Sequence, residues 1–421
     1  MLRSLFIDLN SYFASVEQEL RPELRGRPVI VVPVAADTTS AIAASYEAKA
    51  LGISTGTMVA EAKRLCPTIA IVPARHSVYV DYHHRIVAAV ETVVHVERVM
   101  SIDEMACSLT GRDCHRDRAV ELAHAVKRTL AEQVGSTLRC SIGIAPNDYL
   151  AKTASDMQKP DGLVVIEQTD LPYVLYPLKL RDLVGVGKRM GERLYRNGIY
   201  TVEQLCTASA PELHRAWGSV EGERMYRRLR GEHVPHLETQ KSSISHQHVM
   251  EPGLRSREGA SGVLHRLLQK AAMRLRSYGM HTSNLYVSVR FRSGEKWKSD
   301  LDITPTADTI QLTQILTSVL ETCPWSQGEP FKVTVAFTKI VDGDATPLPL
   351  FDHTGPARER LNDTLDQLNT KYGKNTIYMG TSWNAKHSAP MRIAFHHIPD
   401  LETDSDDHSD DHSDDRSNQT P

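Results

Sequence analysis

Three acidic residues occur where an ionised side chain is costly, and they raise the question of what chemistry this chain performs. Asp103 and Glu104 are adjacent within the apolar, strand-like run Val99–Leu109, and Asp8 follows the apolar run Leu5–Ile7. Neighbouring residues of a strand point to opposite faces, so Asp103 and Glu104 reach one site only where the strand ends or bends into a hairpin. A carboxylate at the end of a buried strand is expensive unless it is paired or bound to a cation.

Adjacent anions repel each other unless a positive charge lies between them. A divalent metal ion supplies that charge, and ligands that are all oxygen suit Mg²⁺ better than Zn²⁺. Three carboxylates at neighbouring strand ends fit a two-metal site for phosphoryl transfer. For Asp103 and Glu104 alone, the alternative is an exposed hairpin tip with two solvated acids. The rest of the chain has to decide between the two interpretations.

The composition is that of an ordinary globular protein with an acidic end. The 421 residues are 24% charged and 41% hydrophobic, enough for two to four domains. The net charge of -3 includes Asp400–Pro421, which repeats Ser-Asp-Asp-His and predicts a disordered acidic tail. The remainder is net basic and suits a polyanionic partner.

Other compositional features exclude several classes of protein. The six cysteines lack the spacing of a zinc site, so we expect reduced thiols. The apolar run near the first residue is too short for a signal peptide. No stretch approaches the ~20 apolar residues of a membrane span. These features predict a cytoplasmic protein without a membrane partner.

Two motifs carry a resemblance to a known family. Asp8-Leu-Asn-Ser-Tyr-Phe-Ala-Ser-Val-Glu17 and Ser101-Ile-Asp-Glu104 resemble the metal-binding motifs of the Y-family (translesion) DNA polymerases. The resemblance implies that Asp8, Asp103 and Glu104 are catalytic and hold two Mg²⁺ ions, for which Mn²⁺ can substitute. It also implies the Leu9 carbonyl as a backbone ligand.

The helical pattern from Tyr12 to Leu20, with Ser11 as its cap, contains two aromatic residues. By the resemblance, Phe13 is the steric gate, an aromatic ring that lies against the sugar and excludes a 2′-hydroxyl, and Tyr12 beside it also contacts the nucleotide. The alternative for both is packing of a helix against a sheet.

Tyr46 and Lys49 are three residues apart, so on a helix or tight turn they project to one side. A cation and a phenol hydroxyl can hold a triphosphate, although by themselves the two residues fit an ordinary surface turn better. The resemblance places them in the small fingers domain, in contact with the incoming nucleotide. Many family members carry arginine instead of Lys49, and lysine lacks the bidentate fork of arginine.

The segment Pro146–Gly162 resembles the part of the family's palm in which Lys159 reaches the triphosphate. For Lys152, a similar contact with the triphosphate and an ordinary solvated position on a helix fit the sequence equally well. Asp148 stands where some relatives have lysine, which weakens any phosphate role at that position.

Two further segments predict contacts with DNA. In Leu183–Ile199, the turn Gly185-Val-Gly187 opens a helix at Lys188, and such an N-terminus binds phosphate through its N–H groups. This pattern is typical of a helix–hairpin–helix that grips the DNA backbone. Arg290 and Arg292 end an alternating strand within a Lys/Arg-rich region, which predicts a sheet with one basic face and salt-sensitive binding.

The segment after the last predicted domain contains Pro347-Leu-Pro-Leu-Phe351, which loosely resembles the clamp-binding peptides of bacterial polymerases. The usual glutamine is missing, and packing is the alternative for Leu350 and Phe351. The following Leu361–Tyr378 resembles the C-terminal extension of the UmuC branch, and Asn10 points the same way. Phe13 is more typical of the DinB branch, so the subfamily stays open.

The resemblance implies an α/β (α+β) right-hand polymerase. The expected domains in chain order are the palm 1–18 and 76–165, fingers 19–75, thumb with helix–hairpin–helix 166–240, little finger 241–343, C-terminal extension 344–399 and acidic tail 400–421. It implies low-fidelity, DNA-templated DNA synthesis past damaged bases in the SOS response by a monomer.

Its expected partners are primer–template DNA, deoxynucleoside triphosphates, a sliding clamp, and UmuD-like or RecA-like accessory proteins. The alternative is a catalytically silent paralogue that binds DNA and clamp; such proteins lose the metal carboxylates, which this chain keeps. A palm-type nucleotide cyclase does not explain the thumb and little finger.

Overall fold

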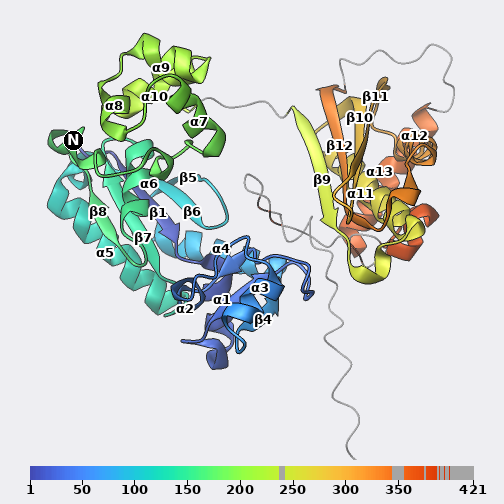
Figure 1. Ribbon diagram of the computed structural model, residues 1–421, viewed down its shortest axis with the longest axis horizontal. Helices are drawn as coiled ribbons and strands as arrows, with labels where there is room; N and C mark the ends of the chain where they lie inside the picture. The colour runs from blue at the N-terminus through green and yellow to red at the C-terminus, as the bar shows by residue number, and fades with distance from the viewer. Residues whose placement is uncertain are drawn as a thin grey trace, which may run out of the picture. The chain divides into compact units, whose positions relative to one another are not determined.

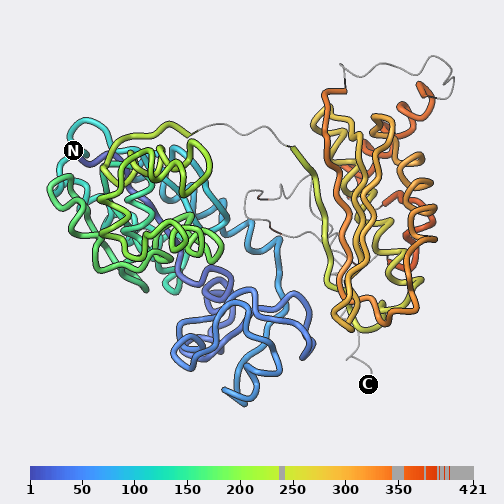
Figure 2. The backbone as a smooth tube through the Cα atoms, turned by 45° about the horizontal axis from the view of Figure 1, so that its top comes forward, coloured from blue at the N-terminus to red at the C-terminus, as the bar shows by residue number. Residues whose placement is uncertain are grey.

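The computed structural model describes residues 1–236, 242–343, 355–373 and 376–385, together with residues 388, 393 and 398. These residues form two compact units: residues 1–236 with 393 and 398 make the first, and the other described residues make the second. Figures 1 and 2 show each unit as a body of its own, blue to green for the first and yellow to red for the second. Leu350, Phe351 and the acidic tail lie outside the described residues.

A five-stranded sheet forms the centre of the first unit. Its order is β5-β6-β1-β7-β8, and β1 pairs antiparallel with both β6 and β7. Every residue of β1 and β7 is buried, as expected for central strands covered on both faces. The strands are β1 Ser4–Leu9, β5 Val96–Val99, β6 Glu104–Ser108, β7 Cys140–Ala145 and β8 Leu163–Val165.

Helices cover the faces of this sheet. Helix α6 packs on β1 and β7, where Phe6, Ala106 and Ala145 share a hydrophobic cluster with Leu150 and Ala151. Helix α5 contacts β7 and α4. The helices are α1 Tyr12–Leu20, α4 His76–Glu91, α5 Arg116–Gln133 and α6 Asp148–Met157.

A small three-stranded sheet of order β3-β2-β4 and a group of short helices complete the first unit. The small sheet carries two short helices, and its elements are β2 Val29–Val32, β3 Ala43–Ala44, β4 Ala70–Pro73, α2 Tyr46–Ala50 and α3 Val59–Leu65. The remaining helices share a core with α6, and they are α7 Lys188–Arg196, α8 Val202–Thr207, α9 Ala210–Trp217 and α10 Glu221–Arg228.

The second unit is a four-stranded antiparallel sheet of order β11-β10-β12-β9, with helices on one face (Figure 1). Along β10, Leu285, Val287 and Val289 are buried and Arg290 is exposed, but Ser288 is buried as well. The predicted alternation of buried and exposed residues is therefore confirmed for only part of the strand. The elements are β9 Ser243–Val249, α11 Arg257–Ser277, β10 Met280–Phe291, β11 Lys296–Thr306, α12 Thr309–Glu321, β12 Pro330–Asp342 and α13 Gly355–Tyr372.

The segment after β12 packs against the helical layer of this unit. Asp366 of α13 forms a two-point ion pair with Arg276 of α11, and both N···O distances are 2.7 Å. Asn362, which is buried, donates to Asp308 at 3.1 Å. Helix α13 is thus joined to the second unit by polar contacts. Within the described ranges, no helix is long and apolar enough to cross a membrane.

Candidate active site

Two strands of the first unit bring the acidic residues together. β1 and β6 are antiparallel neighbours, and their register sets Asp8 directly opposite Glu104. Asp103 precedes β6 in the turn from β5, where its carbonyl accepts the Leu9 N–H at 2.8 Å and its Oδ1 accepts the Ser101 hydroxyl at 2.6 Å. The acids therefore stand where a strand begins after a turn, the geometry that two adjacent carboxylates need to reach one site.

Two lysines from the α6 region fill the space beside the carboxylates. Lys152 Nζ lies 2.5 Å from Asp8 Oδ2 and 2.8 Å from Glu104 Oε1. Lys159 Nζ lies 2.7 Å from Asp8 Oδ1. Asp156 joins both lysines, at 3.3 Å and 2.8 Å. Lys152 is therefore held in ion pairs and is not a freely solvated helix lysine.

A glycine allows α6 to carry Lys152 this close to the sheet. Gly143 of β7 pairs with Phe6 of β1, and a Cβ built at Gly143 would meet the Ala151 carbonyl oxygen at 2.0 Å. Only a residue without a side chain lets helix and strand approach so closely. The Lys152 ammonium then lies 5.3 Å from the centre of the Phe6 ring, on the face of β1 that also bears Asp8.

Burial and charge shift the proton affinities of these groups. Burial raises the pKa of the Asp103 carboxyl, and the charge of Asp8 adds to this effect. Burial also raises the pKa of Glu104. For Lys152, burial alone would lower the pKa, but Asp8 and Glu104 outweigh it, so the pKa of the ammonium is raised. The cluster thus contains concentrated negative charge that is neutralised by lysine.

The donor set fits a hard divalent cation. Its side-chain donors are three carboxylates, and oxygen donors suit Mg²⁺ or Mn²⁺. Among the described residues, no group of three or more His, Cys, Asp or Glu side chains is arranged so that it could hold a metal ion. In this arrangement the Lys152 ammonium stands between Asp8 and Glu104.

The aromatic residues of α1 have different surroundings. Tyr12 is 3% exposed, and its hydroxyl donates to the Tyr79 carbonyl at 2.6 Å. This side chain packs in the interior, so the geometry does not offer its ring to a nucleotide. Phe13 is half-buried, and its ring stacks on that of Tyr79 with a centroid distance of 4.5 Å and an interplanar angle of 17°.

Tyr46 and Lys49 lie on α2, near the beginning of α1. Lys49 Nζ donates to the Ser11 hydroxyl at 2.7 Å and lies 4.4 Å from the centre of the Tyr46 ring. Ser11 occupies the cap position of α1, but its side chain makes no capping bond and its φ is +50°. Such a conformation costs free energy in a non-glycine residue and is often found at functional sites.

The charges of this region act on Tyr46 and Lys49. Burial and the nearby Lys159 ammonium lower the pKa of Lys49, whereas burial raises the pKa of Tyr46. The charges of Lys159 and Asp8 act on both residues. Tyr46 and Lys49 therefore lie close enough to Asp8 and Lys159 for those charges to shift their pKa values.

The predicted hairpin precedes α7. Gly185 has φ +79°, Gly187 is the N-terminal cap, and Lys188 is the first residue of the helix. All three are exposed. The Gly-x-Gly turn that opens a helix is thus confirmed, although Val186 between the two glycines is buried and its N–H donates to the Leu183 carbonyl.

A row of positive charge crosses the exposed face of the second unit's sheet. Arg290 of β10 stands opposite Lys296 of β11 and opposite Lys332 of β12. Burial, followed by the charges of Arg290 and Lys296, lowers the pKa of Lys332. Like charges directly opposite on neighbouring strands are unfavourable, so this row favours binding of a polyanion. Arg292, at the end of the strand, pairs with Glu329 at 3.0 Å.

Other basic residues of this region lie elsewhere. Arg266 of α11 is only 4% exposed, and Arg276 is engaged by Asp366. In the first unit, Asp148, which stands where some relatives have lysine, forms an ion pair with Arg98 at 2.8 Å. The Lys/Arg enrichment of this region does not distinguish the arginines of α11, a helix packed on the sheet, from Arg290 on the exposed face of the sheet. Sequence reasoning missed Lys332, which belongs to no motif.

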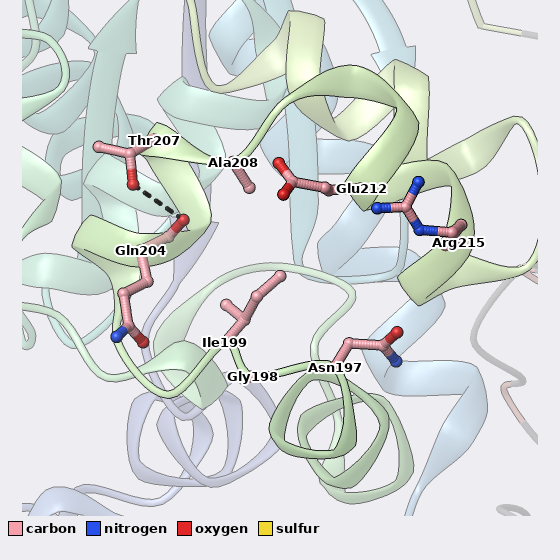
Figure 3. A pocket seen from close by; sticks show the side chains of 8 residues that line it. All are labelled: Asn197, Gly198, Ile199, Gln204, Thr207, Ala208, Glu212 and Arg215. Atoms are coloured by element: carbon pink, nitrogen blue, oxygen red, sulfur yellow. Dashed lines mark hydrogen bonds between the residues drawn. The ribbon is translucent and has the colours of Figure 1, made fainter.

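A polar pocket of about 340 Å³ lies among α7, α8 and α9 (Figure 3). Asn197, Ile199 and Gln204 are among its lining residues, and none of the carboxylates or lysines described above lines it. Gln204 Oε1 accepts the N–H of Thr201, the N-terminal cap of α8, at 3.2 Å, so one polar group of the pocket wall caps a helix.

Comparisons with known proteins decide the family. Residues 7–156 match the family model described as impB/mucB/samB, residues 241–350 match the C-terminal domain of that family, and residues 181–232 match the thumb domain of DNA polymerase-iota. The chain is 33% identical to DNA polymerase IV of Moorella thermoacetica over 90% of this chain and 95% of that protein. It belongs to the Y family of DNA polymerases.

Other similarities agree with this assignment. DNA polymerase IV 1 of Bacillus subtilis is 28% identical over 92% of this chain and 95% of the relative. A Y-family DNA polymerase chimera has the same fold, with a TM-score of 0.67 and 21% identity over 81% of this chain and 99% of the other. DinB from Sulfolobus solfataricus gives a TM-score of 0.52 and 22% identity over 80% and 98% of the two chains.

The relatives named DNA polymerase IV favour the DinB branch, which the sequence left open. This Y-family chain is a DinB-like, DNA-directed DNA polymerase with palm, fingers, thumb and little-finger parts. The expectations of fold and enzyme class are thereby confirmed.

Proposed function

We propose that this polymerase copies damaged templates with low fidelity, using two divalent metal ions held by Asp8, Asp103 and Glu104. The observation that carries the proposal is the pairing of Asp8 with Glu104 beside Asp103 in one partly exposed cluster. Y-family polymerases generally use divalent metals. Bound there, Mg²⁺ or Mn²⁺ would supply charge stabilisation for the attacking and leaving oxygens of an in-line phosphoryl transfer.

The residues of this chain have distinct roles in the proposed reaction. Asp8, Asp103 and Glu104, with the Leu9 carbonyl, form the negative site. Lys159 and Lys49, with the hydroxyl of Tyr46, bind and orient the triphosphate. Lysine and phenol groups suit phosphate oxygens as point donors. Lys152 balances the charge of the carboxylates until substrate and metal arrive, because its ammonium already contacts two of them.

Selection of the sugar is assigned to Phe13. Its half-buried ring rests on Tyr79, so one face is fixed by packing. A ring fixed in this way leaves no room for a 2′-hydroxyl placed against its free face. Phe13 then selects by steric exclusion rather than by hydrogen bonding.

DNA is gripped at two surfaces in this proposal. The exposed residues Gly185, Gly187 and Lys188 at the start of α7 offer N–H groups and charge to one backbone. Arg290, with Arg292 and their basic neighbours, offers a second surface for phosphates. Neither surface reads base edges, so binding is expected to depend on salt and not on sequence.

The three-stranded sheet β3-β2-β4, which lies in the expected fingers domain, supports the proposal of tolerant copying. It has three short strands with two helices of five and seven residues. A fingers domain of this size can make few contacts with the template base. The expected test is primer extension on undamaged and abasic templates with Mg²⁺ or Mn²⁺, where synthesis past the lesion supports the proposal and a stop before it contradicts it.

A non-catalytic accessory protein is the second candidate. It would retain DNA binding but not extend primers on any template. The retained carboxylates argue against it, and the same extension assay separates the two.

Clamp binding is proposed for Leu350 and Phe351, which lie outside the described residues. Burial of two apolar side chains is worth roughly 1.5–3 kcal/mol each, enough for a weak tether. Changing both to alanine should remove stimulation by a clamp and leave clamp-free extension intact; loss of both activities would contradict the tether. UmuD-like or RecA-like partners, a role in the SOS response, a cytoplasmic location and a monomeric state remain proposals from the resemblance.

A further inference from the structure

Beneath Phe13 lies a buried carboxylate that the proposed reaction does not use. Glu17 is 0% exposed, although it lies on the same helix as the proposed gate. Phe13 and Glu17 are four residues apart and therefore share one face of α1. A buried carboxylate is costly unless it is fully paired, so its partners indicate what it holds in place.

Glu17 is hydrogen-bonded by Arg75 and Tyr79, and the Arg21 guanidinium lies 3.8 Å from its Oε2. Arg75, the N-terminal cap residue of α4, donates from Nε at 3.1 Å and from Nη2 at 2.6 Å, one bond to each carboxylate oxygen. The Tyr79 hydroxyl donates to Glu17 Oε1 at 2.8 Å. Such bidentate, charge-assisted bonds are stronger and more directional than neutral ones. They fix both the helix and the direction of the Tyr79 side chain.

Tyr79 joins the buried carboxylate to the gate. Its ring is fully buried, carries the Phe13 ring at 4.5 Å, and ends in the hydroxyl bound by Glu17. His76 meets both rings edge-on, at 6.3 Å from Phe13 and 6.1 Å from Tyr79. The position of the Phe13 ring therefore depends on the Tyr79 ring beneath it. The position of Tyr79 depends in turn on Glu17 and Arg75.

We propose that Glu17 is a positioning residue for sugar selection, acting through Tyr79 on Phe13. This inference rests on the proposed role of Phe13 as the gate. Loss of the Glu17 contact frees the Tyr79 ring to tilt, and the Phe13 ring that rests on it can recede. A recessed ring admits a 2′-hydroxyl, so the expected defect lies in discrimination between sugars and not in the phosphoryl-transfer step.

The test compares variants that remove this contact in different ways. Tyr79→Phe keeps the stacked ring and removes only its hydroxyl; Glu17→Gln removes the charge and keeps the shape. Glu19→Gln is the matched control. Glu19 lies on the same helix and also bonds a cation and backbone, through Arg25 and Thr137, but it does not contact Tyr79. Each variant is assayed for kcat/KM with a deoxynucleotide and with the corresponding ribonucleotide, and for melting temperature.

We expect Tyr79→Phe and Glu17→Gln to lower the preference for deoxynucleotides about tenfold, which corresponds to about 1.4 kcal/mol. Glu19→Gln should leave that preference unchanged. A purely structural role would lower the melting temperature and total activity while the ratio between the sugars stays the same, and that result would overturn the inference. Tyr79→Phe keeps the test valid should Glu17→Gln not fold.

Phe13→Val separates the inference from the function on which it rests. Unchanged discrimination in Phe13→Val contradicts the gate itself. Reduced discrimination in Phe13→Val together with normal discrimination in Tyr79→Phe contradicts only the role of Glu17. In the double variant Phe13→Val/Tyr79→Phe, loss of the hydroxyl should add no further defect, because it acts through the ring already removed. Additive defects would also overturn the inference.

Discussion

Asp8 of β1 stands directly opposite Glu104 of β6, and the Lys152 ammonium lies between their carboxylates, 2.5 Å from one and 2.8 Å from the other. The negative charge of Asp8 and Glu104 is thus balanced by Lys152 before any substrate binds. A divalent cation that enters the cluster must take over contacts now made by lysine. From this relationship we expect folding stability, metal binding and activity to depend on the same small set of residues.

Lys152→Met should destabilise the metal-free protein, because Asp8 and Glu104 would then repel each other with one cation fewer. Mg²⁺ should restore that stability, since a ligand that binds only the folded state stabilises it. We expect Mg²⁺ to raise the melting temperature of Lys152→Met more than that of the wild type. Lys63→Met, which breaks an exposed pair with Asp37, is the control. Equal Mg²⁺ shifts in all three proteins would contradict the displacement of Lys152.

Asp103→Ala should abolish primer extension, at least about a thousandfold, or roughly 4 kcal/mol in transition-state stabilisation. DNA binding should persist, because the proposed DNA surfaces do not include this residue. Extension and DNA affinity are measured on the same preparation. The control Asp113→Ala removes an exposed acid paired with Arg118 and should extend normally. Near-normal extension by Asp103→Ala would refute the metal assignment.

Gly143→Ala should lower the free energy of unfolding by about 1–3 kcal/mol, the usual cost of overpacking a core. The new methyl group would meet the Ala151 carbonyl oxygen at 2.0 Å, so α6 must move away from the sheet. Extension should also fall, since α6 carries Lys152. Denaturant unfolding measures the first effect. Gly253→Ala, whose added Cβ meets nothing within 4 Å, is the control, and equal stability of the two variants would show that the close approach is unimportant.

Arg290→Ala and Lys332→Ala should each weaken DNA binding and reduce the salt dependence of the affinity by about one unit in slope, as expected for one lost phosphate contact. The effect should be the same for unrelated DNA sequences. Fluorescence anisotropy over a range of salt concentrations measures both quantities. The control is Lys371→Ala, an exposed lysine on α13. A slope that matches the wild type would mean that the basic row does not face DNA.

The sequence alone singled out the acidic residues that the structure brings together. Asp8 and the pair Asp103–Glu104 are each short motifs within apolar runs, and the cost of burying charge makes such residues conspicuous. The partial alternation of β10 and the turn that opens α7 are equally local signals, because they depend on neighbours within a few residues. Such features can be predicted wherever the local pattern and the backbone geometry agree.

The tertiary structure decided which distant residues meet. Glu17 and Arg75 are 58 residues apart and form one buried pair, while Lys152 reaches Asp8 only because Gly143 lets α6 approach the sheet. Lys332 joins Arg290 through strand register, and Arg266 is removed from the basic surface by the side of the sheet on which α11 packs. No periodicity encodes these contacts, because register and the face a helix covers are set by the packing of the whole core.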